Sequence, residues 1–488
     1  MRIEELIKPL DITGDHLNLP GFQVRGVACN SKEVSSGFIF VAVKGSKEDG
    51  NRYIQEAISR GAKAIVIQVP GPKPKIPEGV SVIEVKDARK ALAKLAAEFY
   101  GHPSAKIKVI GITGTNGKTT VSYLLEALLK KAGFSPAVIG TVNYRFKNRI
   151  TPSKNTTPGP IELESMLAGM LKEGSTHTVM EVSSHALDQD RVEGINFHSA
   201  IFTNLTQDHL DYHKTLKSYF NAKARLFKNL NPDSFAVINS DDKHAGEIKK
   251  MTRAKVITYG IKNKAKVSAG DIKFDSLGTE FKLISPEGKI DITSRLVGIH
   301  NVYNILAACA WALREGIDIP FIRCAIAEFN FVPGRLERID FAGNFLVFVD
   351  YAHTEDALKN TIKTVRRLTK NRVITVFGCG GERDRTKRPK MGKAVSELAD
   401  YAIISNDNPR SEDPQEIIED IKRGINGDNY CVIPDRREAI KKSLSLAKPG
   451  DIVLIAGKGH EECQIIKNKA VHFSDREVVR ECLRSVNY

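Results

Sequence analysis

The segment IKVIGITGTNGKTTVSYLLEALLKKAG spans residues 107–133 and decides the fold class. Its first part, IKVIGIT, is an apolar, β-branched run typical of a buried strand. After the loop GTNGKTT (114–120), apolar residues recur at helical spacing as far as Gly133, and glycine commonly ends helices. This order of strand, glycine-containing loop and helix predicts an α/β fold with a phosphate-binding loop.

The loop carries the residue types that phosphate binding requires. Gly114 and Gly117 let backbone N–H groups approach phosphate oxygens. Lys118 adds a positive charge, and the Thr119 hydroxyl can bind Mg2+. Ile112 stands where the usual G-x-x-x-x-G-K-[ST] loop has its first glycine, so the motif is a shorter variant and a purely structural turn is the alternative. The flanking strand and helix favour ATP binding by Gly114, Thr115, Asn116, Gly117, Lys118, Thr119 and Thr120.

Length and composition indicate a large globular protein. The 488 residues suggest about three domains, and the 73 Lys+Arg against 58 Asp+Glu give a net charge of +15. The basic residues are dispersed and form no RNA-binding signature, so we expect no nucleic-acid partner.

The apolar runs are too short to cross a bilayer, and MRIEELIKPL is not typical of a signal peptide. Because the N-terminus lacks a signal-peptide pattern, a cytoplasmic location is expected. Seven cysteines, an odd number with no C-x-x-C pair, argue against a disulfide framework or a zinc site.

Short β-branched runs alternate with amphipathic helical stretches along the whole chain, which is typical of parallel sheets covered by helices. The proline-rich segment 70–79 is interpreted as a surface loop, because strand and helix patterns still follow it. HPSAKIK (102–108) is interpreted as a linker, and the turn pair Pro333-Gly334 precedes a new strand run. The expected domains are therefore 1–104, 105–333 and 334–488.

Lys223 stands on the apolar stripe of a predicted helix, KSYFNAKARLFKN (217–229). The helix alone favours snorkelling, in which the stem packs and the ammonium reaches water. A desolvated lysine would instead have a lowered pKa and a nucleophilic amine that CO2 could carbamylate. Two nearby polar segments, EVSSHALDQDR (181–191) and TQDHLDYH (206–213), supply carboxylates and imidazoles and make a site with Mg2+ and a modified lysine credible.

Four apolar runs of the last third, LVFV, VITVF, YAII and DIVLIA, end in polar loops. Ligands collect at the carboxyl ends of strands in open α/β sheets, so these loops are expected to converge on one site. In DNPR (407–410), Arg410 can bind a carboxylate with two parallel hydrogen bonds and Asn408 offers a donor and an acceptor. Out of context, a surface turn is the alternative.

These motifs stand in the order of the Mur ligases, and the chain resembles that family over its whole length. The motifs are TGTNGKTT (113–120), NTTPG (155–159), EVSSHAL (181–187), TNLTQDHLDYH (203–213), the Lys223 helix, GIHNVYNILAA (298–308), PGRLE (333–337), DYAHTEDAL (350–358), FGCGGERDRTKRP (377–389), DNPR and AGKGHE (456–461).

The resemblance implies three domains: an N-terminal α/β domain that holds a UDP-linked substrate, a central P-loop-type ATPase domain and a C-terminal Rossmann-like domain that brings an amino acid. It implies that a glutamyl carboxylate of a UDP-N-acetylmuramoyl dipeptide attacks the γ-phosphate of ATP, and that an amine then displaces phosphate from the acyl phosphate. L-lysine would leave Arg410 unpaired, so DNPR points to meso-2,6-diaminopimelate. Only small-molecule partners, no membrane and a monomer are expected.

The resemblance also assigns residues. The catalytic residues it implies are Lys118, His209, Lys223 and His353. The metal-side residues are Thr119, Glu181, His209 and the carbamylated Lys223, and the further ATP contacts are Asn301, Asn304 and Arg335. The UDP-substrate residues are Cys29, Ser31, Ser46, Lys47, Glu48, Asn155, Thr156, Thr157, Ser183, Gln189 and Arg191. The diaminopimelate residues are Arg383, Asp407, Asn408, Pro409, Arg410, Gly457 and Glu461.

The sequence departs from the family pattern in three places: Cys29 to Lys32 replaces L-D-S-R, Glu355 replaces a proline, and Glu382 replaces an aspartate. An L-lysine-adding ligase and a folate polyglutamate ligase are the alternatives within the fold. A nucleic-acid-dependent ATPase or a catalytically silent P-loop scaffold is the alternative from another class.

Overall fold

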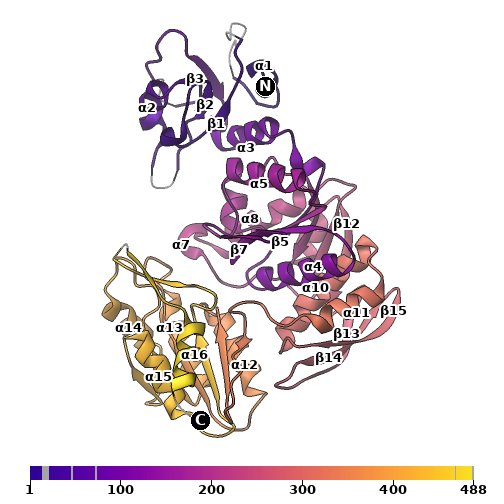
Figure 1. Ribbon diagram of the computed structural model, residues 1–488, viewed down its shortest axis with the longest axis vertical. Coiled ribbons are helices and arrows are strands. Elements are labelled where there is room, and N and C mark those ends of the chain that lie inside the picture. Colours follow the sequence, from indigo (N-terminus) through magenta and orange to yellow (C-terminus); the bar gives the residue numbers. More distant parts are fainter. Residues whose placement is uncertain (14–20, 46–47, 72–73, 468, 486–488) are drawn as a thin grey trace.

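The computed structural model describes residues 1–13, 21–45, 48–71, 74–467 and 469–485. This described part contains three main sheets, of four, eleven and six strands, and a separate two-stranded hairpin. Figure 1 shows three lobes in chain order, from the indigo N-terminal lobe through the central lobe to the yellow C-terminal lobe. The predicted α/β class is confirmed.

The N-terminal sheet is parallel throughout, in the order β1-β2-β3-β4. Its strands are β1 (Gly26–Ala28), β2 (Phe38–Val41), β3 (Ala62–Gln68) and β4 (Ser81–Val85), and its helices are α1 (Ile3–Leu6), α2 (Ile54–Ser59) and α3 (Ala88–Phe99). The expected strand and helix after the proline-rich loop are therefore present as β4 and α3. The Asp87 side chain caps α3 by accepting from the N–H groups of Arg89 and Lys90.

The central sheet has the order β15-β14-β13-β12-β11-β10-β5-β9-β6-β7-β8. Its strands are β5 (Lys108–Thr113), β6 (Pro136–Ile139), β7 (Asn143–Phe146), β8 (Arg149–Pro152), β9 (His177–Glu181), β10 (Phe197–Phe202), β11 (Phe235–Asn239), β12 (Lys255–Gly260), β13 (Val267–Phe274), β14 (Thr279–Ser285) and β15 (Gly288–Ser294). Strand β5 lies between β9 and β10, parallel to both, so the loop after it opens at the middle of the sheet. The outer strands β7 and β8 at one edge, and β14 and β15 at the other, run antiparallel, which the expectation of parallel sheets missed.

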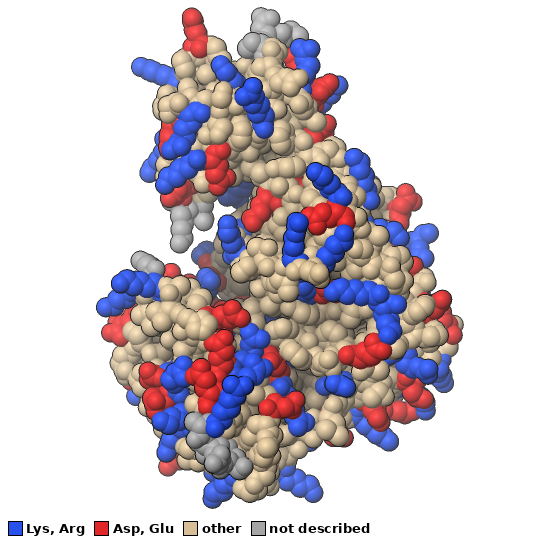
Figure 2. Space-filling view, viewed as in Figure 1, with Lys and Arg blue, Asp and Glu red and all other residues tan. Residues whose placement is uncertain are grey.

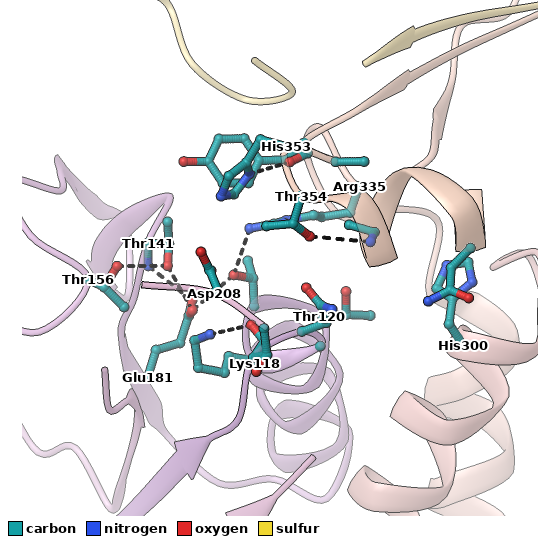
Figure 3. Close-up of a pocket in the computed structure, with 18 of the residues that line it drawn as sticks. Lys118, Thr120, Thr141, Thr156, Glu181, Asp208, His300, Arg335, His353 and Thr354 are labelled. Carbon is teal, nitrogen blue, oxygen red and sulfur yellow. Dashed lines mark hydrogen bonds between the residues drawn. The ribbon is translucent and has the colours of Figure 1, made fainter. Parts of the chain in front are cut away.

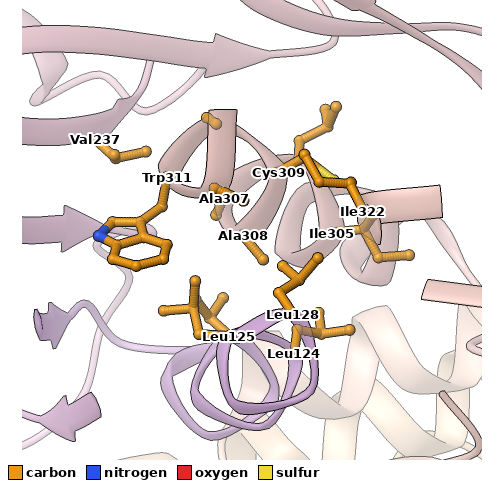
Figure 4. Close-up of a cluster of buried hydrophobic side chains, with 14 of the residues drawn as sticks. Leu124, Leu125, Leu128, Val237, Ile305, Ala307, Ala308, Cys309, Trp311 and Ile322 are labelled. Carbon is orange, nitrogen blue, oxygen red and sulfur yellow. The ribbon is translucent and has the colours of Figure 1, made fainter. Parts of the chain in front are cut away.

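Helices cover both faces of the central sheet. They are α4 (Lys118–Lys131), α5 (Pro160–Lys172), α6 (Ser184–Asp188), α7 (Leu210–His213), α8 (Leu216–Lys228), α9 (Ala245–Met251), α10 (Ile299–Glu315) and α11 (Ile319–Glu328). On one face, Leu125 of α4 packs among buried residues of α10 that include Ile305 and Trp311 (Figure 4). The Trp311 indole N–H donates to Ser199 Oγ at 2.8 Å, which satisfies its one polar atom inside the core. This packing fixes α4, and with it the loop at its start.

The C-terminal sheet has the order β16-β17-β21-β18-β19-β20 and is parallel except for β16. Its strands are β16 (Glu337–Arg338), β17 (Leu346–Asp350), β18 (Val373–Phe377), β19 (Tyr401–Ile404), β20 (Tyr430–Val432) and β21 (Ile452–Ala456). The remaining elements are the hairpin β22 (Cys463–Ile466) and β23 (Lys469–His472) and the helices α12 (Glu355–Arg366), α13 (Lys387–Leu398), α14 (Pro414–Lys422), α15 (Arg436–Leu446) and α16 (Asp475–Ser485). The four predicted apolar runs are β17, β18, β19 and β21.

The N-terminal lobe and the C-terminal lobe contact the central lobe at different places. Helix α3 of the N-terminal lobe packs against α5, and the C-terminal lobe lies beside the loops that follow the central strands. Figure 2 shows Lys and Arg interspersed with Asp and Glu over this face, and a hollow between the N-terminal and C-terminal lobes. No helix in the described part of the chain combines the length and the apolar character needed to cross a bilayer.

Candidate active site

The phosphate loop lies at the floor of a cavity of about 240 Å3 between the central and C-terminal lobes. Gly117 adopts a φ of +88°, a left-handed conformation that favours glycine, and begins α4. A Cβ there would overlap Asn304 Oδ1, so α10 also requires a glycine at this position. Lys118 Nζ donates to the carbonyls of Gly114 (2.9 Å) and Thr115 (2.8 Å), and burial lowers its pKa.

Residues from both lobes line this cavity. Figure 3 shows Lys118, Glu181 and Asp208 of the central lobe facing Arg335, His353 and Thr354. Of the predicted site residues, the cavity brings together Thr115, Asn116, Gly117, Lys118, Thr119, Thr120, Thr156, Glu181, Ser183, His209, Lys223, Asn301, Asn304, Arg335 and His353. Gly114 is held next to it, because its carbonyl accepts from both Lys118 and Lys223.

Lys223 is 1% exposed, so the snorkelling interpretation is wrong. Its Nζ donates to the Gly114 carbonyl at 2.8 Å and lies 4.5 Å from the centre of the Tyr219 ring. Burial, and secondly the charge of Lys118, lowers the pKa of Lys223 well below its ordinary value. The side chain is therefore suited to exist as a neutral, nucleophilic amine at the edge of the phosphate loop.

Glu181, at the end of β9, points its carboxylate at the start of α4. Oε2 accepts from the hydroxyls of Thr119 (2.9 Å) and Thr141 (2.8 Å), and Oε1 accepts from the Thr141 N–H at 3.0 Å. Among the described residues, no three His, Cys, Asp or Glu side chains cluster closely enough to hold a metal alone. A carboxylate beside a hydroxyl fits Mg2+, which commonly takes one or two protein carboxylates and completes its shell with water and phosphate oxygens.

Two histidines face the cavity from opposite lobes. His209 adopts a left-handed φ of +55° just before α7, its Nε2 lies 3.4 Å from Asp208 Oδ2, and burial lowers its pKa. His353 Nδ1 lies 2.7 Å from the Tyr351 carbonyl, and burial lowers its pKa also. Burial therefore favours the neutral form of both imidazoles.

The two asparagines of α10 border the loop side of the cavity. Asn301 Nδ2 donates to the Val297 carbonyl at 2.9 Å, and its Oδ1 accepts from Asn304 Nδ2 at 3.1 Å. Both side chains are buried. The chain of hydrogen bonds fixes the Asn304 amide, whose oxygen lies against Gly117.

Four of the predicted UDP-substrate residues form one network beside Glu181. Arg191 donates to the Thr157 carbonyl at 3.0 Å and to Gln189 Oε1 at 2.7 Å. The Ser183 N–H donates to Thr157 Oγ1 at 3.0 Å. Thr156 Oγ1 lies 3.1 Å from Thr141 Oγ1, and the Asn155 carbonyl accepts from Tyr144. The structure therefore gathers the residues of segments 155–157 and 183–191.

The N-terminal candidates lie in another lobe. Ser31 is buried and its hydroxyl donates to Glu56 Oε2 at 2.8 Å, so that group is occupied within the protein. Cys29 and Glu48 are exposed. The predicted residues Ser46 and Lys47 lie outside the described residues.

The predicted diaminopimelate residues meet where the C-terminal strands end. Gly457 donates its N–H to the Asp350 carbonyl at 3.0 Å, which joins the loops after β21 and β17. Arg410 has a left-handed φ of +56°, its Nη1 donates to the Gly381 carbonyl at 2.6 Å, and burial, followed by the charge of Arg383, lowers its pKa. Asp407 and Pro409 complete the loop. Two guanidinium groups close enough to influence each other make a site suited to an anionic substrate group.

Asn408 differs from the sequence-based expectation, because its amide is already bonded inside the protein. Nδ2 donates to Glu461 Oε2 at 2.8 Å, and Oδ1 accepts from Lys458 Nζ at 3.1 Å. Lys458 is fully buried and was missed by the sequence analysis. A lysine between two glycines carries no periodic pattern that would signal burial, so only its position inside AGKGHE could have drawn attention to it.

Two contacts link the cavity to the loops that carry the predicted diaminopimelate residues Arg383, 407–410, Gly457 and Glu461, here called the amino-acid loops. The Arg335 guanidinium lies 4.5 Å from the centre of the Tyr351 ring, and the Tyr351 hydroxyl lies 3.5 Å from Glu461 Oε1. Gly334 has a left-handed φ of +62°, and a Cβ there would overlap the backbone of Gly459 and His460. The turn before Arg335 therefore touches the loop that carries Glu461.

Comparisons with known proteins agree with this arrangement. The Mur ligase middle domain model matches residues 112–312, the model described as Mur ligase, glutamate ligase domain matches 334–459, and that described as Mur ligase family, catalytic domain matches 23–100. A UDP-N-acetylmuramoyl-L-alanyl-D-glutamate–2,6-diaminopimelate ligase of Geobacillus thermodenitrificans is 46% identical over 482 residues, covering 96% of this chain and 98% of the relative. The ligase of the same name from Clostridium botulinum is 44% identical over 466 residues, covering 95% and 96%.

Solved structures give the same result. A structure of a UDP-N-acetylmuramoyl-L-alanyl-D-glutamate–2,6-diaminopimelate ligase superposes with a TM-score of 0.70 at 35% identity and covers 98% of each chain. A folylpolyglutamate synthase of Mycobacterium tuberculosis reaches a TM-score of 0.63 at 19% identity, over 75% of this chain and 91% of that one, a likeness of fold alone. On the domain models and on relatives more than 40% identical over nearly the whole length, this chain belongs to the Mur ligase family.

Proposed function

We propose that this chain is an ATP-dependent ligase that adds meso-2,6-diaminopimelate to UDP-N-acetylmuramoyl-L-alanyl-D-glutamate, a cytoplasmic step of peptidoglycan precursor synthesis. The observation that carries the proposal is one cavity that joins the phosphate loop and Lys223 to Arg335 and His353 of the other lobe. The full-length relatives of that name support the substrate assignment.

The reaction would proceed in two steps. The glutamyl carboxylate attacks the γ-phosphorus of ATP, which forms an acyl phosphate and releases ADP. The amine of diaminopimelate then attacks the acyl carbon, and phosphate leaves from the tetrahedral intermediate. Lys118 and Arg335 face the cavity from different lobes and would stabilise the charge that moves between carboxylate and phosphoryl group. In its neutral form, His209 or His353 would accept the proton that the attacking amine loses, and would carry a positive charge until it releases that proton.

Mg2+ would be held by the Thr119 hydroxyl and the Glu181 carboxylate, with His209 and carbamylated Lys223 on the same side. When bound, the ion would neutralise phosphate charge. The Lys223 amine would attack CO2 and lose a proton to form the carbamate, and its burial and lowered pKa support that step. Asn301 and Asn304 would border the adenine.

The UDP-linked substrate would extend from segments 155–157 and 183–191 toward the N-terminal lobe, and the amino acid would bind where Arg383, Arg410, Gly457 and Glu461 converge. We propose domain boundaries near 104 and 333. The ends of α3 at Phe99 and α11 at Glu328, each followed by a strand of the next sheet, support them.

The test is phosphate release from ATP in the presence of the UDP-linked dipeptide. Rapid release is expected with meso-diaminopimelate, little with L-lysine and none with DNA. Faster turnover with L-lysine would favour the lysine-adding alternative. Stimulation by DNA alone would overturn the proposal, and no turnover with any amine would favour a silent scaffold.

A further inference from the structure

Lys458 is a buried lysine at the centre of the amino-acid loops. Its side chain is 0% exposed, and Nζ donates to the Cys463 carbonyl (2.7 Å), Glu461 Oε2 (2.9 Å) and Asn408 Oδ1 (3.1 Å). An ammonium has three N–H donors, and each has an acceptor here. Lys458 therefore acts on a substrate only through the groups that it holds.

One of those groups is the Asn408 side chain. Its Oδ1 accepts a second hydrogen bond, from the Ile465 N–H of strand β22 at 3.0 Å. Two donors at one atom identify that atom as the oxygen, so the amide nitrogen must face Glu461 Oε2, 2.8 Å away. Lys458 and the β22 backbone together fix the orientation of the DNPR loop.

The other group is the Glu461 carboxylate. Its Oε2 accepts from both Lys458 and Asn408, whereas Oε1 faces the Tyr351 hydroxyl at 3.5 Å, a long and weak contact. Tyr351 also lines the ATP cavity. The carboxylate is thus anchored through one oxygen and presents the other toward the place where the amino acid would react.

We propose that Lys458 is a positioning residue for the amino-acid substrate, one that holds Glu461 and Asn408 so that Glu461 Oε1 meets the distal ammonium of a diamino acid while Arg410 meets its carboxylate. The inference rests on the proposed function. The half-buried Glu461 carboxylate would be left without its charged partner and free to rotate if it lost its lysine, so binding of the amino acid should suffer most.

The test replaces Lys458 by methionine, which keeps the length of the side chain and removes its charge. For Lys458→Met we expect the KM and Kd for diaminopimelate to rise roughly 30-fold or more. The KM for ATP and the KM for the UDP-linked dipeptide should stay within about threefold of the wild-type values, because these substrates would bind at sites distant from Lys458. Lys469→Met, which changes an exposed lysine of the β22–β23 hairpin that follows Lys458 in the chain, is the matched control and should leave all these constants unchanged.

A double-mutant cycle separates positioning from general structural support. In a Glu461→Gln background, Lys458→Met should raise the KM for diaminopimelate by less than it does in the wild type, because one of the two groups that Lys458 holds is already altered. Additive losses, or equal losses in every substrate constant, would overturn the inference while leaving the proposed function intact. A variant too unstable to assay, beside a stable Lys469→Met, would also overturn it. A wild-type protein that turns over no amine would overturn the proposed function and this inference together.

Discussion

Arg335 Nη2 lies 3.3 Å from Thr119 Oγ1, so a guanidinium of the C-terminal lobe reaches the first turn of the helix that follows the phosphate loop. The same hydroxyl donates to Glu181 Oε2. Thr119 is therefore one point at which the central lobe and the C-terminal lobe touch. A transferred phosphoryl group in this cavity would lie between two cations that belong to different lobes.

Replacing Arg335 by methionine should lower kcat about 100-fold, because it removes a donor aimed at the charge that develops during transfer. The KM for diaminopimelate should change little. Stopped-flow measurement of phosphate release would check both. Arg338→Met, which alters an exposed arginine three residues away, is the control. A large rise in the diaminopimelate KM with an unchanged kcat would contradict the assignment.

Lys223→Ala should abolish ligation, and high bicarbonate should not restore it, because the amine that would carry the carbamate is gone. Wild-type enzyme prepared free of CO2 should regain activity when bicarbonate is added. Lys228→Ala changes an exposed lysine of the same helix and should behave like wild type. Full turnover by Lys223→Ala would show that no carbamate at this position is needed.

Arg410→Ala should weaken the use of diaminopimelate by roughly 10- to 100-fold, the range for a lost charge-assisted hydrogen bond, and should leave the KM for ATP nearly unchanged. Use of L-lysine should fall less, since that substrate lacks the second carboxylate. Steady-state kinetics with both amines would measure the difference, with Arg437→Ala as an exposed control. Equal losses for ATP and amine would mean that the loop has only a structural role.

Glu164 of α5 is buried, neither carboxylate oxygen has a hydrogen-bond partner among the described residues, and burial raises its pKa from 4.5 to about 8. The folded state then holds a proton that the unfolded state releases, so Glu164 makes the protein less stable as the pH rises from 4.5 toward 8. Glu164→Gln should remove this pH-dependent loss of stability, so the substitution should raise the melting temperature more at pH 8 than at pH 5. Glu162→Gln, an exposed position on the same helix, is the control, and a pH-independent effect would contradict the raised pKa.

The sequence predicted the helices and strands whose apolar residues recur at regular spacing. The apolar stripe around Lys223 indicated a buried helix face, and the buried runs of β17, β18, β19 and β21 indicated parallel strands. The antiparallel edges were missed, because strands such as β13 and β14 have one exposed face and only a weak apolar pattern.

The side-chain bonds were less predictable than the elements. Asn408 and Ser31 have the chemistry of ligand-binding residues, yet each makes its hydrogen bonds to neighbours that lie 53 and 25 positions away, Glu461 and Glu56. Such pairings follow from the tertiary fold and leave no local signal. Lys458 was overlooked for the same reason.

The contact between Gly334 and Gly459 leaves no space for even a methyl group on either residue. The backbone of the turn that carries Arg335 is therefore packed directly against the backbone of the loop that carries Glu461, so a displacement of one would displace the other. We expect binding of the amino acid beside Glu461 to be transmitted through this contact to Arg335, which would couple the second substrate to the first half of the reaction.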